Sequence, residues 1–266
     1  MLRTLLALAL CSAAAARAEC SRDINVPLSA SGASIVVNGD TVNGIYPDLM
    51  RALAPKAGCN FIFSVVPRAR QVAMFENGTA DLLIPATRTS ARDRLGIFVP
   101  MMGHRAMLIS LMGNHHAPIS SGQELLEHHE LRVAVVRGFD YGEPYQALLE
   151  ELGKQGRVFT EVDVVAVARL LQAGSADVTI MGPTILDGAI RHDPRIKGLS
   201  GKLRMEALPE LPWGQVGAYI SRSALPLVDQ ALLHEWLERA AKTNAVLEAY
   251  QRYHPADILA ESVRPR

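Results

Sequence analysis

The fold is indicated most strongly by residues 78–92, Gly78-Thr79-Ala80-Asp81-Leu82-Leu83-Ile84-Pro85-Ala86-Thr87-Arg88-Thr89-Ser90-Ala91-Arg92. A glycine turn precedes a continuous apolar run over 81–85, and polar residues follow it. Such a run between helical segments is typical of a strand in a parallel sheet that is covered on both faces. The stretch therefore predicts an α/β protein.

The same alternation extends outward in both directions. Glycine and proline positions mark where the segments begin and end. Strands are predicted at 24–28, 61–66, 107–112, 132–136, 158–162, 177–181 and 216–220, and helices at 47–57, 68–77, 123–129, 144–152 and 165–173. A loop over 29–44 holds a candidate hairpin at Asn38-Gly39. Residues 226–253 keep the apolar spacing of amphipathic helix.

The alternation of strands and helices occurs twice along the chain, and a late strand at 216–220 follows the second set. This order predicts two α/β lobes joined by two crossings of the chain. We expect the crossings near 104–113 and 205–214. Residues 19–108 with 212–266 then form the first lobe, and residues 109–211 form the second. No sequence repeat is strong enough to make the lobes homologous.

The first eighteen residues have the pattern of a cleaved export signal. Arg3 precedes the apolar stretch Leu5–Leu10, and Ala16-Arg17-Ala18 predicts cleavage before Glu19. The stretch is too short to span a bilayer as a helix. A lipoprotein would need a small residue before its cysteine, but Leu10 precedes Cys11 and Glu19 precedes Cys20. We expect a periplasmic monomer that does not insert into the membrane.

Composition excludes several classes of function. The 266 residues contain 27 basic and 27 acidic residues and 5% aromatics. Loss of Arg3 and Arg17 with the leader makes the remainder slightly acidic, so nucleic acid is not an expected partner. The pairs His115-His116 and His128-His129 lack carboxylate or cysteine at metal-ligand spacing, and we expect neither a metal nor a cofactor.

Two cysteines, Cys20 and Cys59, remain after the leader is removed. An even pair in an exported chain predicts a disulfide. Each cysteine comes just before a predicted strand, so both lie at one end of the sheet if those strands are parallel neighbours. The alternative is two unpaired, partly buried thiols.

Five motifs in order carry a resemblance to a known family. They are Gly44-Ile45-Tyr46-Pro47-Asp48-Leu49, Gly78-Thr79-Ala80-Asp81, Thr87-Arg88-Thr89-Ser90-Ala91-Arg92, the strand and turn Val133–Gly138, and Gly174-Ser175-Ala176-Asp177. Together they resemble the family 3 extracellular solute-binding proteins of ABC transporters, along nearly the whole chain after the leader. The resemblance implies a type II periplasmic-binding-protein fold that closes around an amino-acid-like solute.

The resemblance also implies roles for residues of the first lobe. Arg92 would grip a ligand carboxylate, because its guanidinium matches a carboxylate bidentately. Thr87 would complete the carboxylate cradle, and the carbonyls of Pro85 and Ala86 would face a ligand amine. The strand-to-signature spacing is one residue shorter than usual, which puts those carbonyl contacts in question. Arg88 and Arg94 are interpreted as solvated.

Residues 67–70, Pro67-Arg68-Ala69-Arg70, resemble the Pro-Trp-x-Arg run of many relatives. An arginine stands where the relatives carry an aromatic residue. Arg68 and Arg70 either face the cleft or lie on the surface. If they face it, a ligand with more than one negative charge is favoured.

On the second lobe, Gly138 lets the backbone approach a ligand, and amides at the following helix start are donors for an anion. Tyr141 would cover the ligand, whereas Asp140 is either a cap or a ligand contact. Gly182 stands where amino-acid-binding relatives carry the aspartate that pairs with the α-ammonium. Either Asp140 or Asp187 substitutes, or the ligand is not an ordinary α-amino acid.

Three functions remain open on the sequence alone. The first is a receptor, not an enzyme, that binds a small carboxylate-bearing solute by hinge closure and presents it to a membrane permease. The second is a dehydratase-like enzyme on the same fold, which would need a general acid in the cleft. The third is a sensor or accessory protein of a periplasmic redox system.

Overall fold

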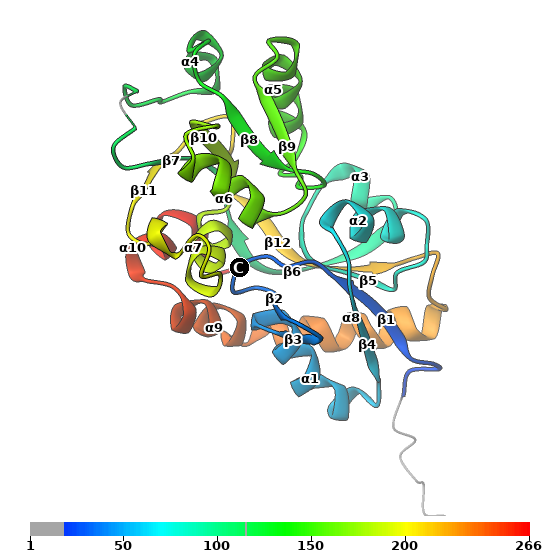
Figure 1. The fold of residues 1–266 in the computed structure, drawn as a ribbon. Helices are drawn as coiled ribbons and strands as arrows, with labels where there is room; N and C mark the ends of the chain where they lie inside the picture. Colours follow the sequence, from blue (N-terminus) through cyan, green and yellow to red (C-terminus); the bar gives the residue numbers. More distant parts are fainter. Residues whose placement is uncertain (1–18, 115) are drawn as a thin grey trace, which may run out of the picture.

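The computed structural model describes residues 19–114 and 116–266 (Figure 1). The expected export signal at 1–18 lies outside these residues. Within them, none of the helices has the length and hydropathy that a membrane crossing requires.

Both ends of the described chain build the first lobe, drawn in the lower part of Figure 1. It contains a parallel pair, β1 with β4, and an antiparallel sheet in the order β13-β6-β12-β5. The strands are β1 (Ile24–Leu28), β4 (Phe61–Val65), β5 (Leu82–Thr87), β6 (Gly96–His104), β12 (Gly214–Ser221) and β13 (Val263–Arg264), with the hairpin β2 (Val36–Asn38) and β3 (Thr41–Asn43). The helices are α1 (Ile45–Ala57), α2 (Arg68–Glu76), α3 (Ser90–Asp93), α8 (Leu227–Lys242), α9 (Ala245–Tyr253) and α10 (Ala256–Ser262).

The second lobe is built around one sheet in the order β11-β7-β10-β8-β9. Its strands are β7 (Met107–Leu111), β8 (Val133–Val136), β9 (Val158–Glu161), β10 (Val178–Met181) and β11 (Leu203–Glu206). Its helices are α4 (Gly122–Glu127), α5 (Glu143–Lys154), α6 (Val164–Gln172) and α7 (Pro183–His192), followed by a 3-10 turn at Lys197–Leu199. The chain enters this lobe between β6 and β7 and leaves it between β11 and β12.

Strand direction differs in one respect from the expected mainly parallel sheets. The pairs β1–β4, β8–β9 and β8–β10 are parallel, whereas β7 and β12 pair antiparallel with their neighbours. Strands β6 and β7 lead directly from one lobe to the other. Strands β7 and β12 each follow a crossing, so they enter their sheets from the other lobe and not through a crossover helix. A crossover helix is what makes successive strands parallel, and both of these strands run antiparallel to their neighbours.

Local sequence explains several element boundaries. Helix α1 ends where Gly58 takes the left-handed conformation with φ of 60°, which glycine adopts without steric cost. The hairpin forms at the predicted Asn38-Gly39 turn. The long amphipathic segment at the C-terminal end, by contrast, is divided at Thr243 and Asn244 into α8 and α9.

The predicted disulfide is confirmed. Strands β1 and β4 are parallel neighbours with Ile24 opposite Phe61, so the cysteines before them lie at the same end of the pair. Cys20 and Cys59 are bonded, with their Cα atoms 4.9 Å apart. The bond joins the segment before β1 to the segment before β4.

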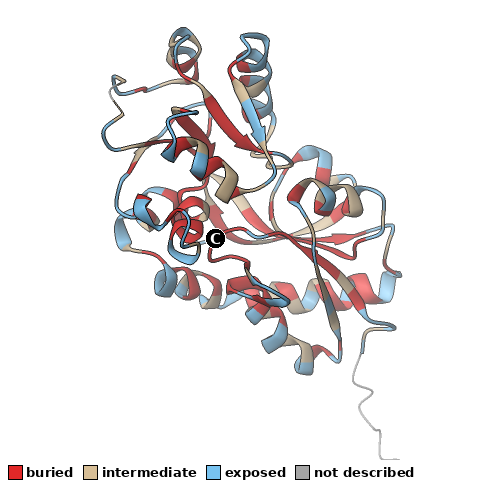
Figure 2. Ribbon diagram, in the orientation of Figure 1, coloured by how far each residue is buried: buried red, intermediate tan, exposed pale blue. Residues whose placement is uncertain are grey.

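Each lobe has its own apolar core, and the buried strands run through them (Figure 2). In the first lobe α1, α8 and α9 cover the sheets from one side. In the second lobe α6 and α7 cover one face of the sheet and α4 and α5 the other. The two cores are separate, and the boundary between the lobes lies between them.

Candidate functional site

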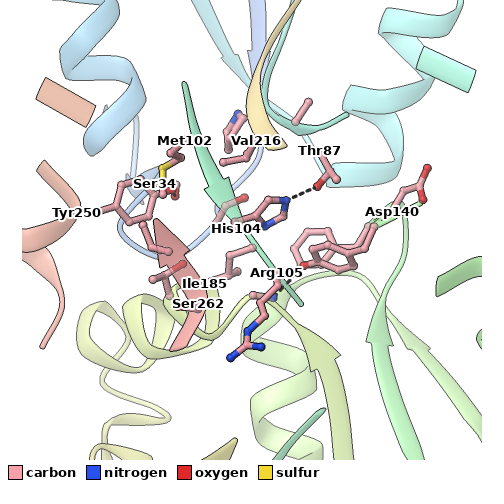
Figure 3. A pocket seen from close by; sticks show the side chains of 18 of the residues that line it. Ser34, Thr87, Met102, His104, Arg105, Asp140, Ile185, Val216, Tyr250 and Ser262 are labelled. Carbon is pink, nitrogen blue, oxygen red and sulfur yellow. Dashed lines mark hydrogen bonds between the residues drawn. The ribbon is translucent and has the colours of Figure 1, made fainter. Parts of the chain in front are cut away.

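A pocket lies at this boundary, and both lobes line it (Figure 3). Its empty volume is about 620 Å³ with the open mouth included, but only about 60 Å³ can hold the centre of a water molecule. The first lobe contributes Ser31, Ser34, Arg68, Pro85, Ala86, Thr87, Met102, His104, Val216, Tyr250, Ser262 and Val263, and the second contributes Phe139, Asp140, Tyr141, Gly182, Thr184 and Ile185. Arg105, in the crossing between them, completes the lining.

The lobes meet closely on two sides of this pocket. Gly138 has φ of 87°, and a Cβ there would lie 2.9 Å from the backbone nitrogen of Ala69 in α2. On the other side, a Cβ on Gly188 would lie 2.4 Å from the backbone nitrogen of Ala33. Both contacts need the absence of a side chain, so this arrangement of the lobes depends on glycine at these positions.

Arg68 reaches into the pocket from the first turn of α2. Its side chain is buried, and Nη1 donates to Gln71 Oε1 (2.8 Å) and to the carbonyl of Pro85 (3.1 Å). Its Nε is buried without a partner, and no carboxylate within residues 19–114 and 116–266 forms a salt bridge with it. Burial, and then the positive charge of Arg92, lower the pKa of Arg68 to about 9. The guanidinium is therefore still charged at neutral pH, and the charge of Asp140 favours its charged form without a salt bridge to it.

Arg92 is buried as well but has a different position. Its Nη1 donates to the carbonyl of Thr87 (3.0 Å), and its Nη2 lies 4.0 Å from Asp140 Oδ2 across the lobe boundary. It lines an outer cleft beside Glu76 and Gly138 rather than the central pocket. Burial lowers the pKa of Arg92, and the Asp140 carboxylate opposes part of this shift.

His104 ends β6 at the centre of the pocket, where its Nε2 lies 3.2 Å from Thr87 Oγ1 (Figure 3). Burial lowers the pKa of His104 to about 4, so the imidazole is neutral at pH 7. The neighbouring Arg105 points away from the pocket centre. Its Nη2 donates to Glu261 Oε2 (2.7 Å), and its guanidinium lies 4.9 Å from the Trp213 ring.

The second lobe closes the pocket with backbone and aromatic groups. Tyr141 packs its ring edge-on against Tyr145, with centroids 5.1 Å apart. Its hydroxyl accepts a hydrogen bond from the Gly182 amide (3.1 Å), and burial raises the pKa of that hydroxyl. This contact ties the end of β10 to the turn after β8.

The structure thus brings six of the nine predicted ligand-binding residues to one pocket: Thr87, Ala86, Arg68, Asp140, Tyr141 and Gly182. Arg92 and Gly138 lie in the adjoining outer cleft. Arg70, two residues after Arg68 in α2, is exposed and lines neither cavity.

Sequence reasoning missed several lining residues. His104 was assigned to a crossing, and Thr184 and Ile185 belong to α7, a helix that was not predicted although Pro183 stands at its first turn. Ser34 and Tyr250, which share a 2.7 Å hydrogen bond, come from a loop and from α9. Their joint position depends on packing between distant segments and leaves no local signal.

Among the described residues, no group of three or more histidine, cysteine or acidic side chains is arranged to hold a metal ion.

Neither the models of known protein families nor the curated proteins include a match to this sequence. Solved structures do match. The arginine-, lysine-, histidine-binding protein ArtJ from Geobacillus stearothermophilus superposes with a TM-score of 0.69 at 16% identity, covering 88% of this chain and 97% of that one. EhuB in complex with hydroxyectoine gives 0.70 at 15% identity, covering 90% and 91%.

A histidine kinase sensor domain with similarity to periplasmic binding proteins also matches, with a TM-score of 0.68 at 16% identity and coverage of 88% and 96%. Identities this low concern the fold. The chain has the two-lobed periplasmic-binding-protein fold that the family 3 resemblance implies, and its neighbours include amino-acid-binding proteins of ABC transporters.

Proposed function

We propose that this protein is a periplasmic receptor that captures a small carboxylate-bearing solute between its lobes and presents it to an ABC transporter. The observation that carries the proposal is Arg68, a buried guanidinium in the inter-lobe pocket with an unpartnered Nε. A buried charge without a counter-ion is costly, and a ligand carboxylate would supply the missing partner bidentately. The expected export signal and the binding-protein fold support this function.

Capture by hinge closure agrees with the glycine contacts at the lobe boundary. Gly138 and Gly188 bring backbone of the second lobe against backbone of the first on two sides of the pocket. A carboxylate held by Arg68 would touch both lobes, because Tyr141 and Gly182 line the same pocket from the second lobe. A ligand that binds both lobes stabilises the closed state over the open one.

The test compares wild type with Arg68→Met in a thermal-shift and calorimetry screen of amino acids, dicarboxylates and aromatic acids. Removing the guanidinium should weaken binding by about 2–5 kcal/mol, which is about 30-fold or more. The unfolding free energy without ligand should stay unchanged or rise, because an uncompensated buried charge is removed. Arg70→Met on the exposed side of α2 is the matched control, with unchanged affinity.

Wild-type binding of an acid that survives Arg68→Met undiminished would refute the assignment of Arg68. A screen in which no acid binds would refute carboxylate capture itself.

The match to a histidine kinase sensor domain supports ligand sensing as a second candidate function. Both functions need the same closed, ligand-bound form and differ in the membrane partner that recognises it. Pull-down of the ligand-bound protein with membrane extracts would separate them. A permease is expected for transport and a kinase or redox enzyme for sensing.

A further inference from the structure

The charges around the pocket are unequal, and this inequality bears on the ligand. Arg68 contributes a cation with free donor capacity. In the described part of the chain, Asp140 is the one carboxylate that lines the pocket. Its Oδ1 accepts hydrogen bonds from the Gly142 amide (2.9 Å) and Gln146 Nε2 (3.1 Å), and its Oδ2 faces Arg92. The Asp140 carboxylate therefore already has partners within the protein.

The other charged groups near the pocket do not change this balance. Arg105 is compensated by Glu261, and His104 is neutral at pH 7. Asp187, the second acid that could serve a ligand ammonium, lies in α7 but does not line the pocket. It accepts hydrogen bonds from Arg191 (2.8 Å) and pairs with His254 Nδ1 (2.8 Å). A ligand ammonium would find no free counter-charge among these groups.

The remaining lining is uncharged and the space is small. The lining includes the hydroxyl-bearing Ser34 and Tyr250 and the apolar Met102 and Ile185 (Figure 3). Thr184 adds a further hydroxyl. The space that the centre of a water molecule can reach is only about 60 Å³. A compact molecule of similar size fits, with its anionic end at Arg68 and an uncharged end against the hydroxyls.

We propose that the pocket selects a compact monocarboxylate whose remainder is uncharged, with a hydroxyl or keto group where an amino acid carries its ammonium. The inference rests on the proposed solute-binding function and specifies the ligand class of the same site. Desolvating an ammonium without a carboxylate to receive it costs several kcal/mol, so the pocket discriminates against α-amino acids of the same shape.

The experiment uses a matched pair, L-lactate and L-alanine, which differ by a hydroxyl in place of the ammonium. Titration calorimetry on the exported form of the protein at pH 7 is expected to give binding of L-lactate tighter than of L-alanine by on the order of 100-fold. Pyruvate and propionate, which also lack an ammonium, are expected to bind better than L-alanine.

Gly182 offers a gain-of-function variant. It lines the pocket with φ of −65°, which any residue adopts, and a Cβ there would meet only Ile185 Cδ1 at 3.6 Å and Cγ1 at 3.7 Å. Gly182→Asp adds a carboxylate to the pocket lining, so it should weaken L-lactate binding and strengthen L-alanine binding, each by about tenfold or more. Gly182→Asn has a similar shape without the charge and should change neither preference. Thermal melts establish that both variants fold.

The outcomes distinguish the two proposals. If wild type binds L-alanine or other α-amino acids as tightly as L-lactate, and Arg68→Met abolishes that binding, the ligand class is wrong while carboxylate capture stands. If no acid of the panel binds wild type, both fail. If Gly182→Asp does not fold, the wild-type comparison of L-lactate with L-alanine still decides the ligand class.

Discussion

Arg68 in the first lobe and Arg157 in the second are both buried arginines without a carboxylate partner among the described residues. Arg157 donates to the carbonyls of Leu125 (2.9 Å), Leu126 (3.2 Å) and Leu131 (2.8 Å), which surround the end of α4. Arg68 uses one of its nitrogens and leaves Nε buried without a partner.

The hydrogen bonds of the two buried arginines indicate different roles. Arg157 stabilises the fold because it donates to carbonyls around a helix end, of which, in the part of the chain that the structure describes, only that of Leu126 has a second side-chain donor, Gln155 Nε2 (3.3 Å). Arg68 keeps donor capacity inside a pocket, and this is typical of a binding residue. Burial alone does not separate the two, whereas the count of satisfied donors does.

The largest effect on stability is expected at Arg157. Arg157→Met should lower the free energy of unfolding by about 3 kcal/mol, because three backbone carbonyls lose a donor. Ligand affinity should stay unchanged, in contrast to Arg68→Met. Urea denaturation measures the unfolding free energy of the two variants, and calorimetry measures their ligand affinity. An Arg157 variant as stable as wild type would remove the distinction between the two arginines.

A smaller effect is expected at Gly138, which packs on the helix that carries Arg68. Gly138→Ala places a Cβ 2.9 Å from Ala69 in a backbone conformation with φ of 87°. Ligand affinity should fall by about 2 kcal/mol, roughly 30-fold, since the closed arrangement becomes strained. Gly153→Ala, where a Cβ meets nothing within 4 Å, is the control. Equal affinities in both variants would show that closure does not need this contact.

His104 provides a pH-dependent test of the same pocket. Its pKa in the folded chain is about 4, below the ordinary value of 6.5. As the pH falls through 6.5 the unfolded chain binds a proton that the folded chain does not, so stability is lost between pH 6.5 and 4. The loss from pH 7 to pH 5 should be about 2 kcal/mol.

His104→Gln removes that titration and should reduce the loss of stability between pH 7 and pH 5 by this amount. Urea denaturation at both pH values measures it. If wild type and variant lose stability in parallel, His104 is not buried as a neutral imidazole.

The smallest effect is expected at Arg92, the residue that the family resemblance favours. Its side chain faces Thr87, Asp140 and the outer cleft, and its Nη2 lies 4.0 Å from Asp140, so Arg92→Gln should weaken binding by about 1 kcal/mol through the lobe contact. Calorimetry against Arg68→Met compares the two positions. A loss as large as at Arg68 would assign the carboxylate grip to both arginines.

Much of the fold could be predicted from the sequence. The strands around Leu82, Val133 and Val178 and the helix after Pro47 follow from apolar runs, periodicity and turn residues. Helix α7 and strand β6 were missed because their apolar spacing is irregular, with Gly188 and Pro100 inside them. The antiparallel pairings at the crossings were missed because strand direction depends on where the chain returns.

The candidate site was predicted in part. Thr87, Ala86, Arg68, Asp140, Tyr141 and Gly182 were expected at the site and line one pocket. His104 and Tyr250 were not expected, since they come from the end of β6 and from α9. Nothing local in these segments indicates that they meet.

The type and order of most elements and the pairing of Cys20 with Cys59 follow from the amino-acid sequence, because periodicity, turn chemistry and strand adjacency act over short distances. Which arginine faces the pocket depends on how the lobes pack. Arg68 and Arg92 are both buried, and other segments supply their partners. Pro85 accepts a hydrogen bond from Arg68, and Asp140 lies 4.0 Å from Arg92. Whether a buried charge is satisfied is a property of the packed chain, and no single segment carries it.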